Sequence, residues 1–466
     1  MLFSSPVFFL FFACYLALHV TVPLRLRLAL IILGSLIFYG YWNPVYLWLP
    51  FAITFIAYRG ALWFMSQPEG RQRKRALTLV IFSLLLPLVI VKYTNFIYRD
   101  VLGLFFGFTE TLTHWELPLG ISFITFTLIA YVVDVYQGKY RLEKNPSMLG
   151  GLVLFFPHLI AGPILRPAEL LPQLHRPGRH FRIRSIFGLA IFTLGLLKKV
   201  CFADPLGEYV TLVYADGAAG LSAMDYLLAI YGFSLQIYCD FSGYTDMAIG
   251  AALMLGVRLP ANFERPYVAT SVVDFWKRWH ITLSRWLRDY LYIPLGGSRL
   301  GFGRRVGNIF ITFGLGGLWH GASWTFVFWG IAHAIGISVV HGLPHVPGLR
   351  TMLRMPKWVK ILVTFHFIAG TWILFRAPDL DTAVRVGLGP FIGSWGGVAE
   401  WSKENIFPLF LLVTFFALHK FDSHQLIRKI VQKLHPSFLW PALLFIWMLC
   451  IAFSQGSSAK FIYFDF

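Results

Sequence analysis

The sequence predicts an all-α polytopic membrane protein, and three observations support this fold class. Hydrophobic residues make up 57% of the 466-residue chain and charged residues only 13%, whereas soluble globular chains carry roughly 25% charged residues. Apolar runs of roughly 20 residues, the length that crosses a bilayer, recur along the chain. The few charges are biased to one sign, with a net charge of +18. These features exclude a disordered chain, a nucleic-acid-binding domain and a soluble enzyme of this size.

The apolar runs define the candidate spans in order. They lie at 7–24, 28–42, 45–65, 76–98, 117–136, 149–165, 185–203, 222–239, 307–341, 358–375, 405–418 and 438–454. The 307–341 run is long enough for a broken span or a pair of helices. Several other runs are short or contain glycine and proline, which favours re-entrant or broken helices. We expect roughly ten to twelve transmembrane and re-entrant helices in one membrane domain over residues 1–466.

The basic residues between spans predict the orientation of the chain. The first apolar run has no basic segment before it and no cleavage site, so it is interpreted as a span rather than a signal peptide. Basic residues follow the first, third and fifth spans, whereas the turn at 41–44 is uncharged. Because basic loops stay in the cytoplasm, the N-terminus is expected outside it. We expect a multi-pass membrane protein.

Residues 274–292 form a basic and aromatic segment within 255–306, the longest region between the predicted spans. At 100° per residue they predict one amphipathic helix with His280 on the seam between a basic and an aromatic face. The aromatic face includes Trp276 and Trp279. The basic face carries Lys277, Arg278, Arg285 and Arg288.

The basic face of this predicted helix would attract phosphate, from lipid headgroups or from a phosphorylated donor such as coenzyme A. An imidazole on the seam suits proton transfer, because the ordinary pKa of histidine is near neutrality. An interfacial helix with no catalytic role has the same pattern, so both interpretations remain open.

His320 stands in an apolar run rich in glycine. No formal charge occurs between Ile309 and Ile331, and an ionisable residue at membrane depth indicates function by default. The neighbouring glycines leave room for a substrate or for a close helix contact. The alternative is a histidine that only packs against a neighbouring helix.

The motifs that are missing narrow the chemistry of His320. No nucleophile elbow, phosphate-binding loop or metal-ligand spacing occurs, and no tightly bound cofactor is expected. A lone deep histidine suits a general base that takes the proton of an acceptor hydroxyl as it attacks an acyl thioester. Such proton transfer contributes about 10²–10⁴-fold to the rate.

Four blocks of sequence resemble the membrane-bound O-acyltransferase family, in its bacterial branch with the membrane subunit of alginate O-acetylation. The blocks lie at 155–166, 240–250, 262–297 and 316–322, and the similarity runs along the whole chain. The resemblance implies a ring of helices around a central tunnel, with His320 and His280 as its catalytic residues. Residues expected to line the tunnel are Trp276, Trp279, Trp319, Asp240, Ser242 and His158.

The resemblance also implies the donor and the partners. The acyl group, acetyl in the simplest case, would come from a cytoplasmic thioester, either acetyl-CoA or a carrier protein. It would pass to an exported polysaccharide such as alginate through an extracytoplasmic SGNH-type transferase and a polysaccharide synthesis complex. Tyr463, in the aromatic C-terminal segment, is a candidate acyl relay, and an interfacial anchor is its alternative.

Two other functions remain open at this point. The first is transfer of D-alanine or another acyl group to a cell-envelope polymer from a carrier-protein thioester. The second is a protein without acyltransferase activity, either a glycan or lipid transporter or a scaffold. No internal symmetry of the kind found in transporters is visible in the sequence.

Overall fold

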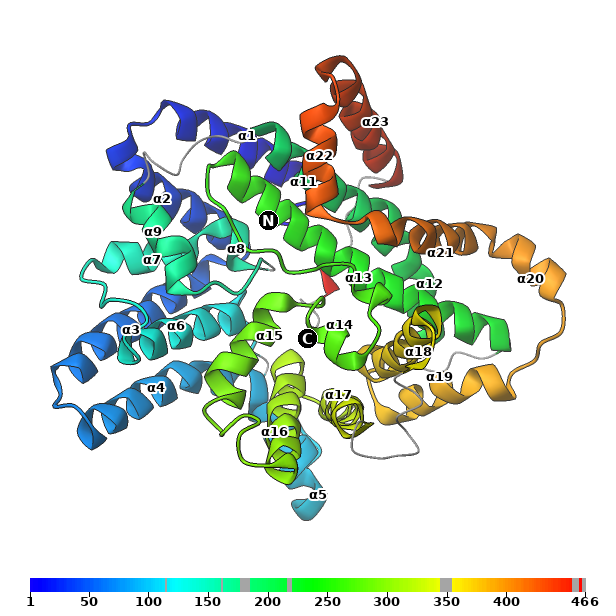
Figure 1. Ribbon diagram of the computed structural model, residues 1–466, viewed down its shortest axis with the longest axis horizontal. Helices are drawn as coiled ribbons and strands as arrows, with labels where there is room; N and C mark the ends of the chain where they lie inside the picture. The colour runs from blue at the N-terminus through cyan, green and yellow to red at the C-terminus, as the bar shows by residue number, and fades with distance from the viewer. Residues whose placement is uncertain are drawn as a thin grey trace. The chain divides into compact units, whose positions relative to one another are not determined.

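The computed structural model describes residues 1–113, 115–160, 162–176, 185–215, 220–343, 354–454 and 461–462. These residues form helices and connecting turns without a strand, which confirms the all-α fold class (Figure 1). The chain has two compact units. The first comprises Met1–Phe192 and Tyr244–Ala261, and the second Thr193–Gly243 and Asn262–Phe466. The expected single domain over residues 1–466 stays a prediction.

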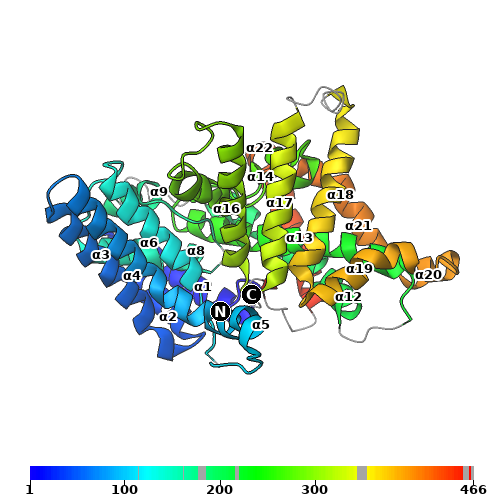
Figure 2. The ribbon, with the colours of Figure 1, turned by 90° about the horizontal axis from the view of Figure 1, so that it is seen from below.

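The first unit is built mainly from the N-terminal helices. Three of them, α3, α4 and α6, pack side by side (Figure 1 and Figure 2). The helices are α1 (Pro6–Thr21), α2 (Arg27–Gly40), α3 (Trp48–Ser66), α4 (Arg71–Asn95), the π-helix η3 (Phe96–Leu102), α5 (Gly103–Phe106), α6 (Ile121–Tyr136), α7 (Pro146–Leu154), α8 (Phe156–Leu159) and α9 (Pro167–His175).

Local sequence explains where these helices begin. The Ser5 hydroxyl accepts a bond from the Phe8 amide at 3.3 Å, and Pro6 follows at the first helical position of α1. Asn145 caps α7 in the same way, again with a proline next to it. Both are N-cap residues followed by a proline whose missing N–H costs nothing there.

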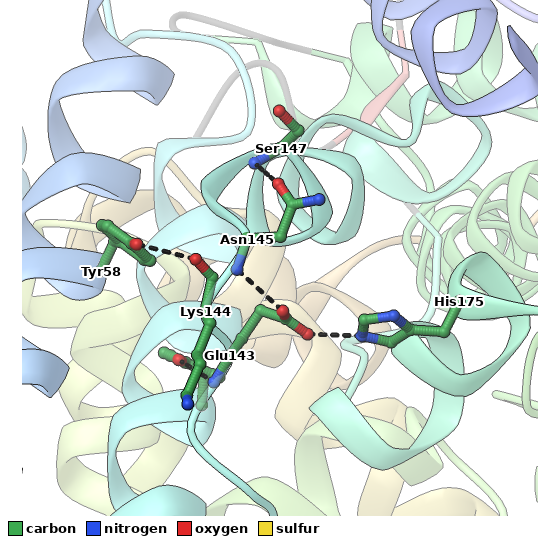
Figure 3. A network of polar contacts seen from close by, with 7 residues as sticks. Tyr58, Glu143, Lys144, Asn145, Ser147 and His175 are labelled. Carbon is green, nitrogen blue, oxygen red and sulfur yellow. Dashed lines mark hydrogen bonds and ion pairs between the residues drawn. The ribbon is translucent and has the colours of Figure 1, made fainter. Parts of the chain in front are cut away.

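A polar network fixes the chain between α6 and α9 (Figure 3). The Glu143 carboxylate is 5% exposed and accepts a bond from His175 Nε2 at 2.5 Å and from the Asn145 amide at 2.9 Å. Tyr58 on α3 donates to the Lys144 carbonyl at 2.9 Å. These bonds connect α3, α9 and the segment before α7. They also give each oxygen of the buried Glu143 carboxylate a hydrogen-bond partner.

The second unit contains most of the described helices that follow residue 192. Two helices, α11 (Ser185–Leu197) and α13 (Ala223–Met254), contain residues of both units. The others are the π-helix η4 (Lys198–Ala203), α12 (Asp204–Tyr214), α14 (Val272–Trp276), α15 (Ile281–Leu287), the π-helix η6 (Arg288–Tyr292), α16 (Phe302–His320), α17 (Trp324–Gly342), α18 (Lys357–Arg376), α19 (Leu380–Ile392), α20 (Val398–Glu404), α21 (Ile406–Leu418), α22 (His424–Lys433) and α23 (Pro436–Ser454).

The long apolar run at 307–341 forms a pair of helices, one of the two alternatives that its length left open. The two helices, α16 and α17, pack closely, and α18 lies on the other side of α17 (Figure 2). A Cβ on Gly317 would meet the Phe326 carbonyl oxygen of α17 at 2.2 Å. The contact therefore needs glycine, which lets two helix backbones approach.

Six helical segments of the described chain are long and apolar enough to cross a membrane, or seven if the bent pair α20 and α21 counts as one span. Two shorter apolar helices, α1 and α6, have 16 residues each. A multi-pass membrane protein is thereby confirmed. The predicted ten to twelve segments, and the ring around a tunnel, stay predictions.

The predicted amphipathic helix over 274–292 is wrong as a single element. The segment is divided into α14, a turn, α15 and η6. His280 is the N-cap residue before α15 and has a left-handed backbone, φ 41°. The Ile281 amide donates to the Asn262 carbonyl at 2.9 Å, and the Glu264 amide donates to the Arg278 carbonyl at 2.9 Å. These bonds to an earlier loop satisfy the backbone groups that a continuous helix would have paired internally.

Candidate functional site

His320 is the last residue of α16 and is 4% exposed. Three aromatic rings surround its imidazole, with centroids 4.9, 5.0 and 5.3 Å away. They belong to Trp319, Trp329 of α17 and Phe375 of α18. The helix ends here because Gly321 is extended, and a Cβ in its place would meet the Phe326 ring. The structure buries His320 among aromatic rings, and its catalytic role stays a prediction.

His280 is fully buried rather than on an interfacial seam. Its ring lies against Phe241, with centroids 4.8 Å apart, and against Trp319, with centroids 6.2 Å apart. Because Trp319 also contacts His320, one indole touches both imidazoles. The two histidines singled out from the sequence are thus brought to the same aromatic cluster of the second unit.

The hydrogen bonds around Asn262 determine which nitrogen of His280 carries the proton. One side-chain atom of Asn262 accepts from the Thr282 backbone N–H at 3.1 Å, and a backbone N–H can only donate. That atom is therefore the oxygen Oδ1. His280 Nδ1 lies 3.2 Å from the same oxygen, so Nδ1 is protonated and donates.

The second ring nitrogen of His280, Nε2, therefore keeps its lone pair. Nε2 is buried and has no hydrogen-bond partner among the residues that the structure describes. Burial lowers the pKa of His280 to about 3, so the ring is neutral at physiological pH. A neutral imidazole with an available lone pair can accept a proton or a hydrogen bond from a substrate hydroxyl.

His333 of α17 is a buried histidine that the sequence analysis missed. Its Nδ1 accepts from Trp276 Nε1 at 3.2 Å, so its Nε2 donates to the Thr371 hydroxyl at 3.1 Å, which donates to the Ile368 carbonyl at 2.7 Å. Both nitrogens are used, which indicates a packing and orienting role. Its isolation in an apolar helix is the same signal that drew attention to His320.

The four predicted phosphate-binding residues do not share one face, because the helix that would align them is broken. Lys277 and Arg288 are exposed, whereas Arg278 and Arg285 are half-buried. Arg278 Nε pairs with Asp274 at 2.9 Å, and Arg288 Nε pairs with Asp289 at 2.7 Å. Only Arg288 among the four lines the cavity described next.

A cavity of about 290 Å³ lies in the second unit beside this segment. Two guanidinium groups line it, that of Arg305 and that of Arg288, which is paired with Asp289, and Trp276 is among its walls. Arg305 Nη2 donates to His341 Nδ1 at 2.6 Å. The remaining lining residues are Val273, Ser284, Leu287, Tyr292, Ser298, Ile309, Thr312, Phe313 and Ile337. A cationic, hydroxyl-bearing cavity with apolar walls suits an organic group that carries phosphate.

The residues expected to line a tunnel are all buried. Trp279 packs on Trp372, with centroids 4.9 Å apart, and Asp240 and Ser242 lie on α13 in the second unit. His158 lies in the first unit, where Nε2 donates to the Leu152 carbonyl at 2.7 Å. The tunnel itself stays a prediction, and Tyr463 lies outside the described residues.

No group of three or more histidine, cysteine, aspartate or glutamate residues in the described part of the chain could hold a metal ion.

The sequence model of the membrane-bound O-acyltransferase family matches residues 34–376, a region that contains both His280 and His320. The chain belongs to the membrane-bound O-acyltransferase family.

The names of three relatives in this family state a function. Probable alginate O-acetylase AlgI of Pseudomonas aeruginosa is 37% identical over 449 residues, 92% of this chain and 84% of that protein. The peptidoglycan O-acetyltransferase of Helicobacter pylori is 38% identical over 438 residues, 87% and 82% of the two chains. The teichoic acid D-alanyltransferase of Bacillus subtilis is 26% identical over 276 residues, 55% and 68%.

Family membership and these relatives make the chain a membrane-bound acyltransferase. The transporter and scaffold alternatives are therefore set aside.

Proposed function

We propose that this acyltransferase moves an acetyl group from a thioester donor toward an exported polysaccharide such as alginate. One observation carries the proposal most strongly: His320 is buried at the end of α16, and the Trp319 indole links it to a second buried imidazole, His280. The acetyltransferases among the relatives support the choice of acetyl.

The proposed chemistry needs one general base. An acceptor hydroxyl oxygen attacks the thioester carbonyl, an ester C–O bond forms, and the C–S bond breaks. His320 takes the hydroxyl proton and passes it to the departing thiolate, which leaves as a thiol. His280 Nε2 is available to accept a hydrogen bond that orients the acceptor, because its Nδ1 is held by Asn262.

The donor is a phosphate-bearing thioester, either acetyl-CoA or a carrier protein. Support comes from the cavity lined by Arg288 and Arg305, whose guanidinium groups suit phosphate oxygens. The enzyme holds no tightly bound cofactor in this proposal.

Tyr463 is the proposed relay. Its phenol oxygen attacks the thioester and forms an aryl ester. A polymer hydroxyl, presented by an SGNH-type partner and the synthesis complex, then displaces the phenol.

We place the chain in the bacterial inner membrane with its N-terminus outside the cytoplasm, since basic loops follow alternate spans.

The teichoic acid D-alanyltransferase relative supports a second candidate, D-alanyl transfer from a carrier-protein thioester.

The test is acetyl transfer by the purified full-length chain in lipid nanodiscs, supplied with radiolabelled acetyl-CoA. We expect His320→Ala to lower thioester consumption by about 10²–10⁴-fold, the range for a general base. His366→Gln is the matched control, because His366 is an exposed histidine on the neighbouring helix α18. Melting temperatures of both variants check that they fold.

Two outcomes would reject parts of the proposal. Wild-type turnover in folded His320→Ala would remove His320 as the base. Transfer of D-alanine from a charged carrier protein, with none from acetyl-CoA, would favour the second candidate.

A further inference from the structure

Three charged side chains meet in the second unit, two of them buried and the third, Asp204, half-buried. Lys199 of η4 reaches Asp240 Oδ1 of α13 at 2.6 Å and Asp204 Oδ1 of α12 at 2.7 Å. The Lys199 and Asp240 side chains are each 2% exposed. One positive and two negative charges leave a negative surplus, and buried charge is costly unless every group is well partnered.

The second carboxylate oxygen of Asp240 binds the backbone of Ile462. Asp240 Oδ2 accepts a bond from the backbone N–H of Ile462 at 2.7 Å. Phe461, the residue before it, is 1% exposed and lies against Phe241, with ring centroids 5.7 Å apart. The buried Asp240 carboxylate thus holds Ile462 by a charge-assisted hydrogen bond. The Phe241 ring, on the same helix, holds Phe461 by apolar contact.

This docking point adjoins the candidate active site. The Phe241 ring contacts both the Phe461 ring and the His280 ring, whose centroids lie 5.7 and 4.8 Å away. In the sequence, Tyr463 directly follows Ile462. The residue proposed to accept the acyl group is therefore bonded to Ile462, whose amide is held by Asp240.

We infer that Asp240, oriented by Lys199, is a docking site for the enzyme's own C-terminal segment and positions that segment for acyl transfer. The role in acyl transfer rests on the proposed function, whereas the docking of the segment on Asp240 is independent of it. Asp240 acts through the segment that it holds and is a positioning residue. Its carboxylate, interpreted from the sequence as a tunnel wall, serves here as a receptor for a peptide N–H.

Asp240→Asn tests this inference, because an amide group has only one accepting oxygen. It therefore cannot accept hydrogen bonds from both Lys199 and the Ile462 N–H on its two terminal atoms. With its oxygen facing Lys199, its NH₂ group faces the Ile462 N–H, and two donors repel. With the oxygen turned toward Ile462, the NH₂ group faces the Lys199 ammonium. The positive charge favours the first arrangement, so docking is lost, while Lys199 keeps Asp204 as its counter-ion.

Docking is measured by hydrogen exchange at the Ile462 amide in the purified full-length chain. We expect exchange in Asp240→Asn to be about tenfold faster or more, the loss of one hydrogen bond to a charged group. Asp204→Asn is the matched control, since it removes the same charge beside Lys199 but leaves the carboxylate that accepts from Ile462. Its Ile462 exchange should stay at the wild-type rate.

Positioning is measured by acetyl incorporated into the C-terminal segment as the acetyl-CoA concentration is varied. We expect the maximal rate in Asp240→Asn to fall about 100-fold, as for a small misplacement of a reacting group, with an unchanged half-saturating donor concentration. General loss of structure would change both quantities and the melting temperature.

The outcomes separate the two proposals. Wild-type exchange at Ile462 in Asp240→Asn overturns docking, whatever the transfer assays give. Faster exchange with an unchanged rate of acetyl incorporation overturns the positioning role. A protected Ile462 amide in a wild-type chain that takes up no acyl group supports docking and rejects the proposed function.

Discussion

His280 has a backbone conformation that few residues other than glycine adopt, with φ 41° and ψ 54°. Such strain is retained where the surroundings overdetermine it, and it concentrates at functional sites. Here Asn262 supplies the constraint, because its oxygen accepts from His280 Nδ1 and from both donors of Thr282. The result is a neutral ring whose Nε2 lone pair has a fixed direction.

The lowered pKa of His280 predicts a pH dependence of stability. The pKa of His280 is about 3 in the folded chain and ordinarily 6.5. Between pH 3 and pH 6.5 the unfolded chain therefore binds more protons at this residue than the folded chain does. The resulting stability is fully present above pH 6.5 and is lost as the pH falls toward 3. At pH 5 the loss from His280 is about 2 kcal/mol.

His280→Asn tests this linkage, since asparagine tolerates a left-handed backbone and does not titrate. We expect the melting temperature of the wild type in detergent to fall more than that of His280→Asn between pH 7.5 and pH 5. Equal losses in the two proteins would show that His280 does not carry the linkage.

At the level of single residues, the sequence shows which polar side chains stand alone in apolar runs better than it shows which side chains contact one another. His320 could be singled out because no formal charge stands near it, and the structure buries it as expected. His333 gives the same signal and was overlooked. Asn262 gives no signal, because its role depends on contact with residues 18 and 20 positions later. Which groups meet across such separations depends on tertiary structure.

At the scale of elements, α16 and α17 are held together by backbone contact. A Cβ on Gly317 would lie 2.2 Å from the Phe326 oxygen, and one on Gly330 would lie 2.2 Å from the Phe313 oxygen. Both obstacles are backbone atoms, which cannot move aside as a side chain would. Because His320 ends α16, the contact that locks these helices also places the candidate base.

Gly317→Ala should therefore destabilise the protein by about 1–3 kcal/mol, the usual cost of overpacking, and reduce acyl transfer. Gly314→Ala lies one turn away on the same helix, where a Cβ meets nothing within 4 Å, so it should be neutral or slightly stabilising through helix propensity. Melting temperatures of the two purified variants give the comparison. Equal melting temperatures would contradict the close contact at Gly317.

The segment at 274–292 shows where helical periodicity fails as a predictor. The run at 307–341 was interpreted from its length, which is local information and allowed a broken span or the pair of helices that the structure has. The break at His280 has no glycine or proline beside it. It depends on bonds to the Asn262 loop, so a periodic pattern predicted one continuous helix where the structure has two.

For the whole molecule, composition is the strongest predictor. Low charge and high hydrophobicity predicted a multi-pass membrane protein, which six long apolar helical segments in the described chain confirm. Composition does not indicate which buried charges pair. Lys199, Asp204 and Asp240 fall within or beside apolar runs, and only the packing of α12, α13 and η4 brings them together.

The distribution of charge predicts the orientation of the molecule, and α3 offers a test. Val45 before the helix is 72% exposed, and the Glu69 side chain after it is 87% exposed. In a Cys14→Ser background, which removes the exposed native thiol, we expect an impermeant maleimide to label Val45→Cys in intact spheroplasts. Glu69→Cys should react only after permeabilisation, because basic loops remain in the cytoplasm.

The reverse pattern of labelling would invert the topology and place the basic loops outside. Labelling of both cysteines from the same side would mean that α3 does not cross the membrane. The Glu69–Arg73 ion pair, lost in one variant, lies at the surface and contributes little to stability. A change in labelling can therefore be assigned to membrane sidedness rather than to unfolding, provided that both variants keep the melting temperature of the parent.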